Sequence, residues 1–208
     1  MISFPLNYPL RLSFKFFALT PQFSLIDANG RIVGWAAQKL FRLREAVTVF
    51  SDSSRKETLF MINADRVIDF GARYHFSDAS GKPLGSVQRL GLKSLWKAKY
   101  DILDTRDPSM SRESARIIMT IREDNPWIKV LDGVIGVIPL AELFTGFFLH
   151  PAYSVSRADG TVVMRIRKQA AFWESRFLVE KKAELSELDE QRVLLSLIMV
   201  VLLERSRG

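Results

Sequence analysis

The sequence contains no cysteine and only two histidines, His75 and His150, among its 208 residues. The lack of cysteine excludes disulfides, thiolate catalysis, palmitoylation and cysteine metal sites, and it is typical of proteins from a reducing compartment. Two histidines leave little material for a histidine metal site. We therefore expect a cytoplasmic protein without a bound metal or other cofactor.

The common motifs of catalysis and phosphate binding are also missing. The chain has no Gly-x-Ser-x-Gly, no Gly-x-x-x-x-Gly-Lys, no Gly-x-Gly-x-x-Gly and no His-Glu-x-x-His. Its turns carry too few carboxylates for a calcium-binding loop. These absences favour a protein that is not an enzyme, although a site built from dispersed residues stays open as an alternative.

No apolar run is long enough to span a membrane. The run from 193 to 203 has one hydroxyl, Ser196, and no charge, but it has only 11 residues, whereas about 20 are needed to cross the hydrocarbon core. A helix that is apolar on every side must be enclosed on every side. We therefore expect a buried central helix at 187–205. At the other end, Pro5 and Pro9 interrupt the apolar stretch and no basic leader precedes it, so we expect no signal peptide.

Four segments have the pattern of an antiparallel hairpin, in which two alternating runs flank a short polar turn. They are residues 23–39, 47–62, 74–89 and 153–167. The turn aspartates recur at intervals of 25, 26 and 26 residues, at Asp27, Asp52, Asp78 and Asp104. We expect Asp27, Asp78 and Asp159 to bond neighbouring backbone N–H groups and not to form a shared ligand site.

Alternation within the strands predicts a sheet with one apolar face. In the segment 161–168, Val162, Met164 and Ile166 fall on one face, while Arg165 and Arg167 fall on the other. A sheet of hairpins exposes its edges unless it closes into a barrel, and the apolar helix would fill the lumen. We predict a mainly β, single-domain protein over 1–208, with 1–22 as an N-terminal extension or first strand.

Two stretches do not fit the hairpin pattern. Residues 106–112 are expected to form a polar loop, and the apolar region 127–151 is expected to contain a strand before Pro139 and a short helix at 140–144. Phe144, Phe147 and Phe148 in this region fit core packing, a membrane-dipping loop or a surface that binds another protein.

The net charge of +7 and the isoelectric point near 9.8 make the surface attractive to phosphate groups. In the segment 89–99, cations surround an aromatic side chain, which is the pattern expected at a lipid interface. A hairpin whose apolar residues pack inward and whose lysines are solvated would have the same sequence pattern. A second basic strip lies at 165–168. Nucleic acid is disfavoured because stacking aromatics are not interleaved with these charges. The candidates for contact with lipid headgroups are Arg89, Lys93, Trp96, Lys97, Lys99, Arg165 and Arg167.

The repeated order of strand, Asp-x-x-Gly and strand is followed by Phe-Trp-Glu-Ser-Arg-Phe-Leu-Val-Glu at 172–180 and by a last helix with an acidic start. This order, over roughly 8–205, resembles the superfamily of tubby C-terminal-like domains, which includes the LURP-one-related proteins and the phospholipid scramblases. The resemblance implies a closed antiparallel barrel of roughly twelve strands around a hydrophobic C-terminal helix.

The roles known for this superfamily are mostly non-enzymatic: tubby domains hold phosphoinositide headgroups, and scramblases associate with membranes and calcium. The absence of cysteines for acylation and of a calcium loop argues against scramblase activity. The resemblance implies a cytoplasmic binding or scaffold protein, peripheral to the membrane, with anionic phospholipid as its ligand. The alternatives are an enzyme with a small-molecule site at the barrel mouth, involving His75 or His150, and a protein-interaction module.

Overall fold

The protein is described by a computed structural model over residues 5–15, 22–37, 47–65, 72–90, 99–106, 115–124, 152–169 and 174–205. The strands are β1 Leu10–Lys15, β2 Gln22–Ile26, β3 Ile32–Ala37, β4 Val47–Phe50, β5 Thr58–Ala64, β6 Arg73–Asp78, β7 Pro83–Arg89, β8 Lys99–Asp104, β9 Arg116–Asp124, β10 Ala152–Arg157, β11 Val162–Gln169 and β12 Glu174–Lys181. They are followed by the helix α3, Glu187–Arg205.

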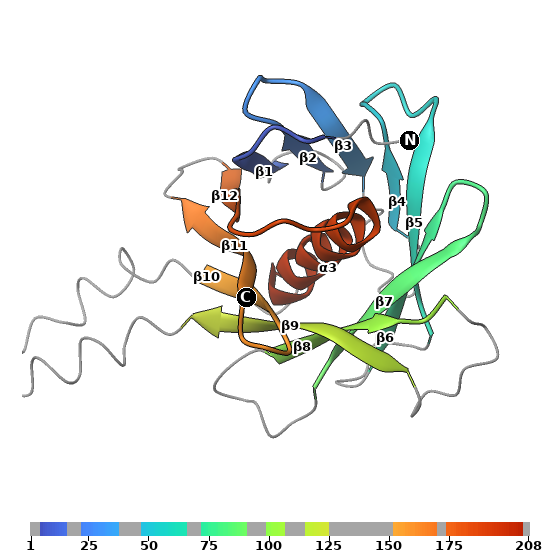
Figure 1. Ribbon diagram of the computed structural model, residues 1–208. Coiled ribbons are helices and arrows are strands. Elements are labelled where there is room, and N and C mark those ends of the chain that lie inside the picture. The colour runs from blue at the N-terminus through green and yellow to red at the C-terminus, as the bar shows by residue number, and fades with distance from the viewer. Residues whose placement is uncertain are drawn as a thin grey trace, which may run out of the picture.

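Each strand pairs antiparallel with its neighbours in the chain, and β1 pairs with β12 to close the barrel. Figure 1 shows α3 lying inside the ring of strands. Every side chain from 193 to 201 is at most 5% exposed. The prediction of a closed antiparallel barrel around a buried C-terminal helix is therefore confirmed, and the hydrophobic effect of this burial holds helix and barrel together.

The four predicted hairpins are β2–β3, β4–β5, β6–β7 and β10–β11. Asp27, Asp78 and Asp159 act as predicted, because a carboxylate oxygen of each accepts hydrogen bonds from backbone N–H groups two or four residues later. In the first turn, Asp27 Oδ1 accepts from Asn29 N at 3.0 Å and from Arg31 N at 2.9 Å. The same pattern recurs at Asp52, Asp78 and Asp159.

Because the strand order follows the chain order, the connections alternate between the two ends of the barrel. The short aspartate turns all lie at one end, which we call the turn end. The C-terminal ends of β1, β3, β5, β7, β9 and β11 lie at the other end, which we call the loop end. The helix α3 follows β12 and enters the barrel at the turn end.

One inward-facing residue was assigned wrongly from the alternation of β11. Met164 and Ile166 are fully buried and Arg165 and Arg167 lie on the outer face, as predicted, but Val162 is 38% exposed. The register between β10 and β11 shifts after Val155. Such a β-bulge adds one residue to one strand and breaks the period of two, so Val163 takes the buried position instead.

The strand before Pro139 and the helix at 140–144 lie outside the described residues, as does the loop at 106–112 apart from Arg106. No helix in the described ranges is both long enough and apolar enough to cross a membrane.

Candidate functional site

Lys99 and Arg122 form a pair of like charges on the outer face of the barrel, close to the loop end. The register of β8 and β9 places them directly opposite each other. Their neighbours Tyr100 and Ile121 are fully buried and face inward, so the two cations point outward. Among the described residues neither cation has an ion-pair partner. Like charges directly opposite destabilise a sheet, and an anion bound between them would reduce their repulsion.

The other described member of the predicted cluster, Arg89, lies at the same end of the barrel but on a different face. Leu90 N donates to Lys99 O at 3.0 Å, which brings the ends of β7 and β8 together. However, Arg89 is opposite the inward-facing Tyr100 and shares its face with the buried Val87. It therefore lies at the mouth of the lumen, half-buried, and does not extend the outward-facing pair. Lys93, Trp96 and Lys97 lie outside the described residues.

The predicted strip on β11 lies on the outer face, but carboxylates partner both of its arginines. Arg165 Nε lies 2.8 Å from Asp124 Oδ2, and Arg167 Nη2 lies 3.2 Å from Glu180 Oε2. Glu180 also lies 3.5 Å from Lys182 Nζ. Two carboxylates offset two of these three cations, which leaves less positive charge for a ligand than at Lys99 and Arg122.

A separate group of charges lies at the turn end, around the first turn of α3. Arg192, 3% exposed, donates from Nε to Leu84 O at 2.6 Å, from Nη1 to Asp189 Oδ1 at 2.9 Å and from Nη2 to Asp104 Oδ1 at 2.9 Å. A bulge in β7 leaves Leu84 without a partner on β6. The next residue, Gly85, has a φ of +155°, and a Cβ there would lie 2.9 Å from Leu103 O and 3.1 Å from Arg192 Nε. Glycine thus permits the close approach of the arginine to the strand.

Glu190, in the first turn of α3, is the second buried charge of this group. It accepts a hydrogen bond from Tyr8 Oη at 2.8 Å and one from Lys181 Nζ at 3.2 Å. Burial and the adjacent carboxylate raise the pKa of Tyr8 far above its ordinary value. Burial lowers the pKa of Lys181, but hydrogen bonds to Glu184 and Glu190 outweigh it, and the net shift is upward. Because these groups satisfy one another, we assign them to anchoring α3.

His75, a candidate of the enzymatic alternative, lies on β6 between Asn63 on β5 and Ser86 on β7. Its pKa is lowered, chiefly by burial, although the charge of Asp65 acts in the opposite sense. Within the described ranges no three His, Asp or Glu side chains gather in a way that would hold a metal ion. His150 and the three phenylalanines Phe144, Phe147 and Phe148 lie outside those ranges.

The model of the LURP-one-related family matches the chain over residues 33–200, from β3 to most of α3. No curated protein matches the sequence.

Proposed function

Since the chain belongs to the LURP-one-related family, we propose that it is a non-enzymatic, cytoplasmic binding protein of that family. In this proposal, the outer face of the barrel near the loop end binds the anionic headgroups of phospholipids and attaches the protein to a membrane surface.

The observation that supports this proposal is the directly opposed pair Lys99 and Arg122. Directly opposed residues have Cβ atoms about 5 Å apart, and two cations placed in this way match the charge of a phosphate group. Basic groups near an anionic bilayer contribute about 1 kcal/mol each. The net charge of +7 would also steer the protein toward such a surface.

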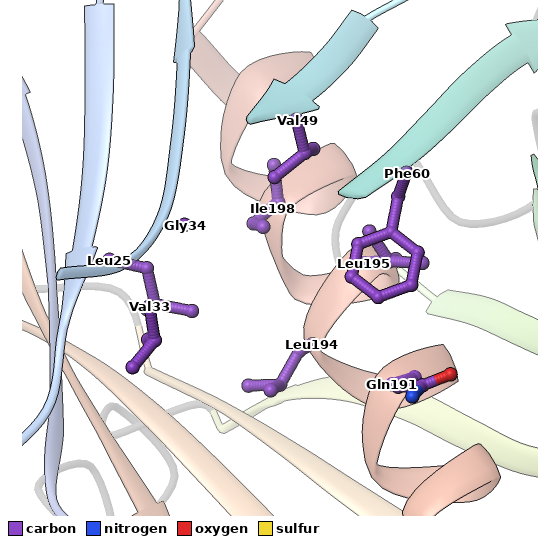
Figure 2. Close-up of a pocket in the computed structure, with 9 residues that line it drawn as sticks. All are labelled: Leu25, Val33, Gly34, Val49, Phe60, Gln191, Leu194, Leu195 and Ile198. Atoms are coloured by element: carbon purple, nitrogen blue, oxygen red, sulfur yellow. The ribbon is translucent and has the colours of Figure 1, made fainter. Parts of the chain in front are cut away.

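One described cavity of the interior fits a binding role better than a catalytic one. The cavity between α3 and strands β2 to β5 (Figure 2) is lined by apolar residues and a single amide, that of Gln191. General acid–base catalysis requires a titratable group within reach of the substrate, and this cavity has none among its lining side chains.

The test is co-sedimentation with vesicles of phosphatidylcholine, with and without phosphatidylserine or a phosphoinositide, at low and at physiological salt. We expect binding only to the anionic vesicles, and weaker binding at higher salt because exposed charges are screened. The double variant Lys99→Ala, Arg122→Ala should bind about 30-fold more weakly, since two contributions of about 1 kcal/mol are lost.

The matched control is the double variant Arg165→Ala, Arg167→Ala, which removes the same formal charge. Both arginines are already ion-paired, so we expect its affinity to stay within a few-fold of the wild-type value. Equal losses in both double variants would show that only net charge matters and would refute the assigned site. Negligible binding of the wild type to every vesicle at low salt would refute the lipid proposal itself.

A further inference from the structure

The pair Lys99 and Arg122 belongs to a row of outward-facing residues that crosses four adjacent strands, β8 to β11. Ser154 on β10 is opposite Arg122, and Arg165 on β11 is opposite Ser154. Because adjacent strands lie about 4.8 Å apart, the backbone of Arg165 is about 10 Å from that of Arg122. The row therefore contains three cations, enough for a ligand with more than one phosphate group if all three were available.

Asp124 occupies the third cation of this row. It follows Arg122 by two residues on β9, so both side chains lie on the same face of the sheet. Its Oδ2 lies 2.8 Å from Arg165 Nε and accepts a hydrogen bond from Ser154 Oγ at 3.0 Å. The guanidinium of Arg165 thus reaches across β10 toward the strand of Arg122, but the carboxylate that it meets there offsets its charge.

A second carboxylate bounds the pair on the side toward the turn end. Asp101 follows Lys99 by two residues on β8, and the alternation of the strand places both side chains on the outer face. Asp101 is opposite Thr120, whose hydroxyl donates to Asp101 Oδ1 at 3.2 Å. Carboxylates repel anions, so the positive charge open to a ligand is confined between Asp101 and Asp124. This space suits a single phosphate group.

We propose that the site takes one phosphate group of a lipid and that Asp124 is the residue that sets this limit. The inference rests on the headgroup function proposed above and names its ligand class, which is anionic lipids with a single phosphate, such as phosphatidylglycerol. A second phosphate, placed beside one between Lys99 and Arg122, would meet the carboxylate of Asp124 and a guanidinium that is already paired. A bisphosphorylated phosphoinositide therefore gains nothing from its extra phosphate groups.

The test compares co-sedimentation of the full chain with two kinds of phosphatidylcholine vesicle at equal total lipid charge. One contains phosphatidylglycerol and the other contains phosphatidylinositol 4,5-bisphosphate. The wild type should bind the two within about two-fold of each other. Asp124→Asn keeps the shape of the side chain, removes its charge and frees Arg165. This variant should bind the bisphosphate vesicles about five-fold more tightly than the phosphatidylglycerol vesicles, the gain expected from one added basic group at an anionic surface.

Two further variants separate the freed arginine from a change in net charge. Glu184→Gln removes the same formal charge near the turn end, where the side chain of Glu184 is 95% exposed and its Oε2 lies 3.0 Å from Lys181 Nζ. It should leave the ratio of the two affinities unchanged. Asp124→Asn combined with Arg165→Ala should lose the preference for the bisphosphate, because the guanidinium that would meet the second phosphate is gone.

Three results would overturn the single-phosphate limit: a wild type that already prefers the bisphosphate vesicles, equal changes of the ratio in Asp124→Asn and Glu184→Gln, or a preference that persists in the double variant. In each of them the wild type still binds anionic vesicles, so the headgroup proposal stands. Absence of wild-type binding to both kinds of vesicle at low salt would instead refute the headgroup proposal, and this inference with it.

Discussion

Asp104 links the barrel wall to the helix inside it. One oxygen accepts hydrogen bonds from Arg192 Nη2 and from Arg106 Nε, both at 2.9 Å, and the other accepts from Arg106 Nη2 at 2.7 Å. The hydrogen bonds from Arg106, together with the charge of Arg192, lower the pKa of Asp104 to about 2, against the opposing effect of its partial burial. The carboxylate therefore stabilises the folded state only while it is ionised.

A lowered pKa in the folded state gives stability that is present above the ordinary pKa of about 4 and is lost as the pH falls to about 2. At pH 7 we expect Asp104→Asn to lower the free energy of unfolding by about 1–3 kcal/mol, because a charged hydrogen bond of buried Arg192 is weakened. The deficit relative to wild type should shrink between pH 4 and pH 2. Urea unfolding at pH 7, 4 and 2.5 measures both effects.

Asp52→Asn serves as the control for this comparison. Its carboxylate bonds within its own exposed turn, to Ser54 and to Ser51 Oγ, so its replacement should have a much smaller effect at pH 7. If Asp104→Asn showed the same deficit at pH 7 and at pH 2.5, the ionised carboxylate would not be the cause of the stabilisation.

At the scale of a single element, α3 allows two contributions to the free energy of unfolding to be compared. One comes from apolar packing and the other from its one buried hydroxyl group. Leu197 is 1% exposed and Ser196 is fully buried. Ser196 Oγ donates to Arg192 O at 2.7 Å, a carbonyl that also accepts the helical N–H bond four residues on. Removal of the hydroxyl therefore leaves no buried group without a partner.

We expect Leu197→Ala to lower the free energy of unfolding by about 2–5 kcal/mol, because lost transfer energy and a new cavity both contribute. Ser196→Ala should change it by less than about 1 kcal/mol. Urea denaturation of the two variants and the wild type, compared at equal slopes, gives both values. A loss for Ser196→Ala as large as that for Leu197→Ala would show that the hydroxyl, and not the packing, holds this part of the helix.

For the whole molecule, the features that could be predicted from the sequence are those that a pattern of neighbouring residues indicates. The hairpins follow from alternation and Asp/Gly turns, and the enclosed helix follows from its apolar circumference. The bulge that exposes Val162 could not be predicted, because it depends on register with β10. The opposition of Arg122 to Lys99 was missed for the same reason, since it exists only once β8 and β9 pair.

The buried charges were missed because burial of an ion depends on its partners. From the sequence alone, Arg192 is interpreted as a charge that flanks the apolar run. In the structure it is buried, with 3% of its surface exposed. Its hydrogen-bond partners Leu84 and Asp104 are 108 and 88 residues away in the chain. A buried charge is tolerated only when such partners satisfy it, and no local pattern shows which distant residues will do so.

The strands and the helix depend on each other for their apolar contacts, so we expect the barrel not to fold without α3. Burial of about ten large side chains contributes on the order of 15–30 kcal/mol before entropy is counted. That exceeds the net stability of about 5–15 kcal/mol typical of a folded domain. A chain that ends at Ser186 should therefore show neither a cooperative thermal transition by circular dichroism nor dispersed amide signals by NMR. Co-expression of residues 187–208 as a separate peptide should restore both, whereas a cooperative transition in the truncated chain alone would show that the strands can form a core without the helix.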